Sequence, residues 1–133
     1  MRYLPFLFLL LLALATGCND DDDNTPACTI GEWTGAFSGT ATCDGVSNPV
    51  AVSSVLSPDN TVRLQYVITE ASGATSTTSY DPIAVTDCEI DEMDSGGGLT
   101  VAIRATVSTD GIEIREEISS GGSTSVCVIT ATR

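Results

Sequence analysis

The sequence predicts an all-β domain that folds as a small antiparallel up-and-down barrel, with a β-sandwich as the alternative. Apolar and polar residues alternate along short segments, which is typical of strands with one buried face. Turn residues, above all glycine, separate these segments about every 8–12 residues. After residue 17, no segment has a convincing helical period.

Residues 1–17 have the pattern of a secretory signal peptide. Arg2 supplies a positive charge, residues 4–14 form an apolar run, and small residues follow up to Gly17. The run is shorter than the roughly 20 residues that a membrane-spanning helix needs. We therefore expect this segment to direct export and then to be removed.

The four residues Ala15-Thr16-Gly17-Cys18 resemble the lipobox of bacterial lipoprotein precursors, although alanine replaces the more usual leucine at the first position. The resemblance implies cleavage before Cys18, a diacylglycerol on its thiol and an acyl chain on its freed amine. Two or more acyl chains hold a protein stably at a membrane. The membrane, reached through the lipid on Cys18, is therefore an expected partner.

Residues 18–26 are expected to form a disordered acidic tether, because Asp20, Asp21, Asp22 and Asp23 repel one another and cannot be buried. A run of this kind just after the lipidated cysteine resembles the surface-export tag of lipoproteins in one large group of Gram-negative bacteria. The resemblance implies an outer-membrane lipoprotein on the cell surface. The simpler alternative is a spacer.

Residues 27–133 form one expected domain, the β-barrel. The chain has a net charge of −13, five Arg, no Lys and no His. Nucleic acid is a poor partner for such a surface, because binding it requires a cationic patch. Without His or Lys, the commonest general base and Schiff-base chemistry are both missing. We expect a protein that is not an enzyme and has no cofactor.

The first half of the domain shows three strand patterns. Residues 31–43 alternate small and aromatic residues with Thr and Ser, residues 50–56 follow, and residues 62–68 form a half-buried strand. Turn residues lie at 57–60 and 71–73. Gly35, Gly39 and Ala41 would face inward, which fits either room for a ligand or tight strand curvature.

The second half begins with a Thr/Ser-rich stretch, residues 75–80, which fits a solvated strand. Pro82, just after it, disfavours a central position in the sheet for this strand. Ile83, Val85 and Cys88 continue the alternation. Residues 99–107, 112–118 and 124–133 are further strands, separated by glycine-containing turns at 94–98, 109–111 and 119–122.

Gly31-Glu32-Trp33 at the start of the first strand, and Arg133 at the end of the last, resemble the calycin pattern of lipocalins and their relatives. The resemblance implies a barrel closed by Arg133 packing across the Trp33 ring, a cation–π contact. The Thr-Asp-Tyr motif of lipocalins is missing. Avidin-like barrels also open in this way, but their pocket uses several Trp and this chain has one, so biotin is not implied.

Four cysteines remain after Cys18, and their scattered spacing indicates two disulfides rather than a metal site. Three pairings are open to four cysteines. If Arg133 meets Trp33 as the calycin resemblance implies, strand parity turns Cys43 and Cys127 inward on neighbouring strands. This predicts Cys43–Cys127 and Cys28–Cys88. Ideal register would place Cys43 opposite Ser123, so a bulge or shift is required.

Two groups of charged residues are candidate sites. Asp87, Glu89 and Asp91 would share a strand face with Glu92 and Asp94 close by, which suggests either a calcium site or a solvated face. The loop lacks a full calcium motif, which favours the solvated face. Glu113, Arg115 and Glu117 are interpreted as an exposed, ion-paired strand face rather than as acid–base groups.

The expected function follows from these features. We expect a lipid-anchored protein whose barrel binds a small apolar ligand or an envelope protein. The alternative is a structural or interaction module of the cell envelope, with its core filled by its own side chains and no ligand. Interior volume distinguishes these two cases, because small eight-stranded barrels barely hold one ligand.

Overall fold

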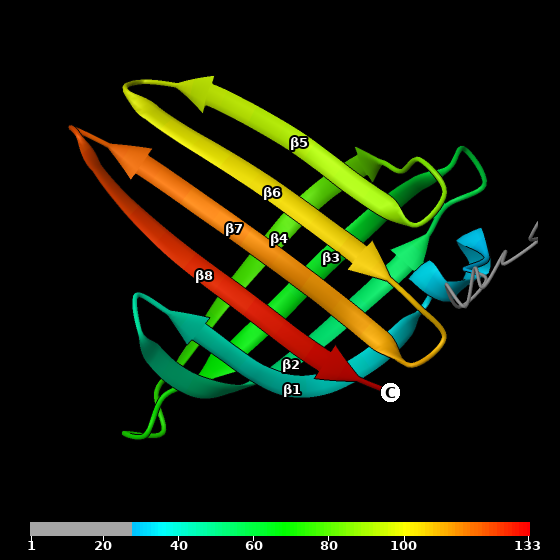
Figure 1. Ribbon diagram of the computed structural model, residues 1–133, viewed down its shortest axis with the longest axis horizontal. Coiled ribbons are helices and arrows are strands. Elements are labelled where there is room, and N and C mark those ends of the chain that lie inside the picture. Colours follow the sequence, from blue (N-terminus) through cyan, green and yellow to red (C-terminus); the bar gives the residue numbers. More distant parts are fainter. Residues whose placement is uncertain (1–27) are drawn as a thin grey trace, which may run out of the picture.

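The computed structural model describes residues 28–133, which form a single antiparallel β-sheet preceded by a short 3₁₀ helix (Figure 1). The helix η1 is Ile30–Trp33. The strands are β1 (Gly35–Cys43), β2 (Val46–Leu56), β3 (Thr61–Thr69), β4 (Thr75–Ala84), β5 (Glu89–Gly96), β6 (Leu99–Val107), β7 (Gly111–Ser120) and β8 (Ser123–Thr132).

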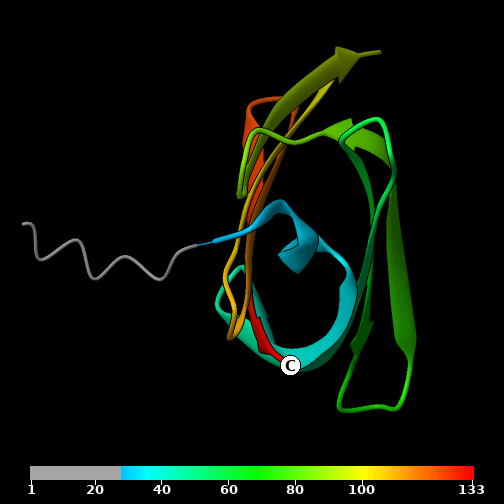
Figure 2. The same ribbon diagram turned by 90° about the vertical axis from the view of Figure 1, so that its right-hand side faces the viewer.

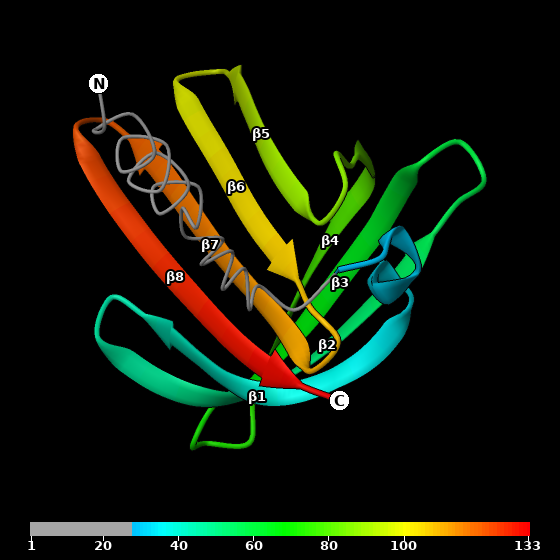
Figure 3. The same ribbon diagram turned by 45° about the vertical axis from the view of Figure 1, so that its right-hand side comes forward.

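The strand order is β4-β3-β2-β1-β8-β7-β6-β5, so every neighbour is also a neighbour in sequence except for β1 and β8. Pairing of β1 with β8 bends the sheet into a nearly closed up-and-down barrel, which confirms the predicted fold class and excludes the sandwich. Strands β4 and β5 are the two ends of the sheet and do not pair with each other (Figure 3). We call this unpaired junction between β4 and β5 the seam.

Tight turns set the register of three hairpins. Asp44-Gly45, Gly97-Gly98 and Gly121-Gly122 each have positive φ at both central positions, as a type I′ turn requires. The first of these turns joins Cys43 to Val46, so β2 begins four residues before the predicted start at residue 50. Asp44-Gly45 is a strong sequence signal for this type I′ turn.

The first strand also differs from its prediction. Residues 31–33 belong to η1, and β1 begins only at Gly35. Figure 2 shows η1 lying between the two walls of the barrel, across one end. A strand would have carried Trp33 along the wall, whereas the 3₁₀ turn places it inside the end of the barrel, where it is fully buried.

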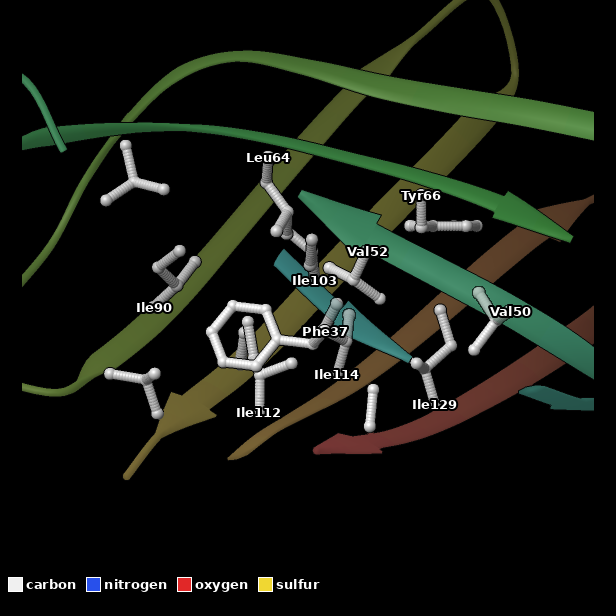
Figure 4. Packing of buried hydrophobic residues seen from close by; sticks show 14 of the residues in the cluster. Phe37, Val50, Val52, Leu64, Tyr66, Ile90, Ile103, Ile112, Ile114 and Ile129 are labelled. Carbon is white, nitrogen blue, oxygen red and sulfur yellow. The ribbon is translucent and has the colours of Figure 1, made fainter. Parts of the chain in front are cut away.

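Apolar side chains from both walls fill the barrel. Figure 4 shows Phe37, Leu64 and Ile114 among the side chains that meet in the core. Gly39 lies so close to β8 that a Cβ there would come within 2.0 Å of the Thr130 carbonyl oxygen. Gly39 therefore serves strand curvature, and together with the buried core this argues against the interpretation that small inward residues leave room for a ligand.

The only helix in residues 28–133 is η1, and this part of the chain contains no helix that is long and apolar enough to span a membrane.

Candidate functional site

One buried carboxylate lies inside the barrel. Glu116 of β7 is only 6% exposed, because it continues the inward-facing series of Ile112 and Ile114. Its Oε2 accepts a hydrogen bond from the Tyr66 hydroxyl of β3 at 2.5 Å and a second from the Tyr80 hydroxyl of β4. This cluster of Glu116, Tyr66 and Tyr80 connects opposite walls of the barrel.

The cluster has unusual electrostatics. Within residues 28–133, Glu116 forms no ion pair, so two hydroxyl donors take the place of a cation. Burial, and then the hydrogen bond to Glu116, raise the pKa of the Tyr66 hydroxyl well above its usual value. The same two causes raise the pKa of Tyr80. Both tyrosines therefore remain protonated donors at neutral pH.

Glu116 was not among the site residues predicted from the sequence. The signal was available, because residues two apart in a strand face the same way and Glu116 shares parity with Ile112 and Ile114. The charged group predicted on this strand consists of its neighbours Glu113, Arg115 and Glu117 instead. The cluster also lies beside a disulfide, since Glu116 is directly opposite Cys127 in the pairing of β7 with β8.

A groove of about 240 Å³ opens at the seam. Tyr80, whose hydroxyl is bonded to Glu116, lines this groove, so the buried cluster and the surface groove share one side chain. Apolar and acidic residues complete its walls: Pro82, Ile83 and Ala84 from β4, Glu92, Met93 and Asp94 from β5, and Val101 and Ile103 from β6. Met93 is 69% exposed, the largest value among the exposed large apolar side chains of the described chain.

A larger hollow of about 400 Å³ lies elsewhere, against strands β5 to β8. Charged side chains line much of it, and two of them, Arg104 and Asp91, form an exposed ion pair at 3.2 Å. Ion pairs at such exposed positions contribute little. The seam is the better candidate site, because its groove coincides with an unpaired strand edge and with exposed apolar surface.

Trp33 and Arg133 close one end of the barrel. The Trp33 Nε1 donates to the Asp87 carbonyl at 3.0 Å, and the Ser54 hydroxyl donates to the Trp33 carbonyl. Arg133 donates from Nη2 to the Glu32 carbonyl at 2.6 Å and pairs with the Glu32 carboxylate at 2.8 Å. The two ends of the domain therefore meet at this barrel end.

The expected contact of Arg133 with the Trp33 ring takes another form. The guanidinium lies over the Phe37 ring, 4.8 Å from its centroid, and binds backbone carbonyls on both sides of Trp33. Trp33 leaves the strand for η1, so the ring that β1 presents under Arg133 is that of Phe37. The stacking partner named from the resemblance is thereby corrected.

Both predicted disulfides are present. Cys28 pairs with Cys88 at a Cα separation of 6.1 Å, and Cys43 pairs with Cys127 at 4.0 Å. Cys43 is directly opposite Cys127 rather than Ser123. The required shift arises because Trp33 is not part of β1, so register counted from it does not apply.

The other charged residues lie on the outer surface. Glu89 and Asp91 are exposed on β5, whereas Asp87 lies in the turn before this strand with a positive φ of 54° and does not share their strand face. Arg115 and Glu117 form an exposed ion pair at 2.7 Å. In residues 28–133, no group of three or more His, Cys, Asp or Glu side chains is arranged to hold a metal ion. The expected lipid site Cys18, the signal and the tether lie outside the described residues.

Comparison with known proteins supports the fold alone. No family model matches the chain, and no curated protein matches it. A solved structure described as a redesigned beta barrel is similar, with a TM-score of 0.57 and 16% sequence identity. The match covers 81% of this chain and 97% of that chain.

Proposed function

We propose that this protein is a lipid-anchored, surface-displayed binding module that attaches to another envelope protein through the seam of its barrel. The observation that carries the proposal is the groove at the junction where β4 and β5 do not pair. The anchor rests on the lipobox resemblance ending at Cys18, and surface display rests on the acidic run that follows it. The lipocalin-like assignment rests on Gly31-Glu32-Trp33 and Arg133.

Volume favours a protein partner over a small apolar ligand. Pockets for small molecules usually measure about 300–1,000 Å³ and bury most of the ligand. The seam groove measures about 240 Å³ and is open to solvent. It suits one or two side chains of a partner whose remaining contacts lie along the strands.

The filled core supports the same choice. Trp33, Phe37 and Leu64 are at most 2% exposed and belong to one core cluster, so the protein's own side chains fill the interior of the barrel. The alternative expectation from the sequence was an interaction module with a filled core and no ligand. Partner binding at the seam names the surface through which such a module would interact. Catalysis is not proposed, because the chain lacks His and Lys.

Photocrosslinking in the native host tests the proposed function. A photoreactive amino acid in place of Met93 should give an adduct with another protein, identified by mass spectrometry. The matched control replaces Val55, a comparably exposed apolar residue on β2. Equal adducts at both positions, or none at 93, would contradict partner binding at the seam. A co-purifying small molecule seen by native mass spectrometry, and lost when the seam is blocked, would favour the small-ligand alternative instead.

The anchor has its own test. Cys18→Ser should abolish incorporation of labelled fatty acid and partitioning into detergent. If the variant still incorporates fatty acid, the lipoprotein assignment is wrong.

A further inference from the structure

We propose that the partner binds as an extended, basic peptide segment that adds a strand to the open edge of β5. This inference rests on the proposed function and names the chemistry of the partner. Strand addition to an exposed sheet edge is a recurring mode of peptide recognition, in which main-chain hydrogen bonds give affinity and side-chain pockets give specificity.

The backbone of β5 is arranged for this mode. Glu89 exchanges both of its backbone hydrogen bonds with Thr86, at 3.0 and 3.1 Å, so its amide points away from β6. The carbonyl of the neighbouring Cys88 instead points toward β6, where it accepts a hydrogen bond from the N–H of Val107, the last residue of that strand. Bonded and non-bonded pairs alternate along an antiparallel ladder. The amides and carbonyls of Asp91, Met93 and Ser95 therefore face the seam without a strand partner.

The edge of β4 is less suited to strand addition. Pro82 has no N–H to donate, and the pairing of β4 with β3 shifts register between Val62 and Leu64, opposite this part of β4. Proline and bulges are devices that protect edge strands from pairing. Strand β5 contains no proline, and its pairing with β6 runs without a shift from Glu89 to Gly96.

Charge selects a basic segment. The two strands that flank the seam carry five carboxylates, Asp81, Glu89, Asp91, Glu92 and Asp94, and neither strand contains Lys or Arg. Two cations lie on the next strands: Arg104 of β6 is paired with Asp91, and Arg63 of β3 lines a hollow with Asp81, outside the seam groove. Glu92 and Asp94 line the groove and have no ion-pair partner among the described residues.

The same charges disfavour two other occupants. A second copy of this chain would bring an equally acidic β5 against the first, and like charges facing each other across a sheet are destabilising. The second is the acidic run at residues 20–23 of this chain, which has the same sign of charge as β5 and would be repelled by it.

The groove also has room for an apolar side chain of the basic segment, which would pack against Met93, Pro82 and Ile83.

The test uses the full chain, purified in neutral detergent, and three synthetic peptides of eight residues, the length of β5. The first alternates lysine with valine, the second alternates glutamate with valine, and the third is the first with alternate backbone nitrogens methylated. Titration calorimetry measures affinity, and amide hydrogen exchange by NMR locates the contact. The lysine peptide should bind and slow exchange at the amides of Asp91, Met93 and Ser95, whereas the other two should bind at least about tenfold more weakly.

Paired charge variants sharpen the test. Glu92→Gln combined with Asp94→Asn should weaken binding of the lysine peptide about fivefold, given the modest worth of exposed ion pairs. The control, Glu70→Gln combined with Glu113→Gln, removes the same charge away from the seam and should change affinity less than about twofold.

Several results would overturn strand addition. These are equal binding of the methylated peptide, protection of amides away from β5, or sedimentation showing that the seam is occupied by a second copy. If the crosslink at position 93 succeeds but the lysine peptide does not bind, partner binding stands and strand addition falls. If both fail, the proposed function falls as well.

Discussion

Replacing Glu116 with alanine should lower the free energy of unfolding by about 3 kcal/mol. The Tyr66 hydroxyl, on a residue only 3% exposed, would lose its acceptor at a buried position. A stranded polar group of this kind costs about 2 kcal/mol. Loss of the Glu116 methylene contributes about 0.8 kcal/mol more. The half-buried Tyr80 can turn to water and adds little.

The matched control is the adjacent residue. Glu117 faces outward and pairs only with the exposed Arg115, so Glu117→Ala should change stability by less than about 0.5 kcal/mol. Glu116→Gln retains an acceptor oxygen and should cost about 1 kcal/mol. Urea unfolding followed by tryptophan fluorescence measures all three, since Trp33 is the sole tryptophan. Equal effects of the alanine variants at 116 and 117 would refute the cross-barrel role of Glu116.

Three further predictions concern pH, the disulfides and the tether. Because burial raises the pKa of both Tyr66 and Tyr80 in the folded state, the contribution of these two hydroxyls to stability should be constant below pH 10.0 and should be lost above it, by about 1.4 kcal/mol per pH unit from Tyr66 and by less from the half-buried Tyr80, measured by urea unfolding; Tyr66→Phe should make the fall less steep. Non-reducing peptide mapping should find Cys43 joined to Cys127, and replacing both by serine should cost about 2–4 kcal/mol in the same unfolding assay. Replacing residues 20–23 with alanine should leave the protein lipidated but hidden from external protease; unchanged exposure would reduce the run to a spacer.

Much of the fold followed from local chemistry. Alternation along residues 62–68 and 99–107 identified β3 and β6, because a sheet with one buried face imposes a period of two. Pro82 correctly indicated that its strand does not lie in the centre of the sheet, since β4 is an edge strand. Strand parity also paired the cysteines correctly, although it was applied to a first strand that began too early.

The remaining features depend on contacts between distant segments. The 3₁₀ turn at Trp33 forms because the indole fills one end of the barrel and bonds to Asp87, which is 54 residues away in sequence. The seam depends on how far the whole eight-stranded sheet bends, which includes the close approach of Gly39 to β8. Local sequence patterns do not predict the total bend of a sheet. Strand parity alone could have predicted that Glu116 faces inward. Its contacts with Tyr66 and Tyr80 could not be predicted in this way, because they depend on which strands lie across the barrel from β7.

Amide hydrogen exchange of the unliganded protein tests the open seam most directly. We expect alternating protection along β5, with fast exchange at Asp91, Met93 and Ser95 and slow exchange at Ile90, Glu92 and Asp94, whose amides face β6. Uniformly slow exchange along the strand would mean that the β5 edge is already paired, and would contradict both the seam and the binding proposed for it.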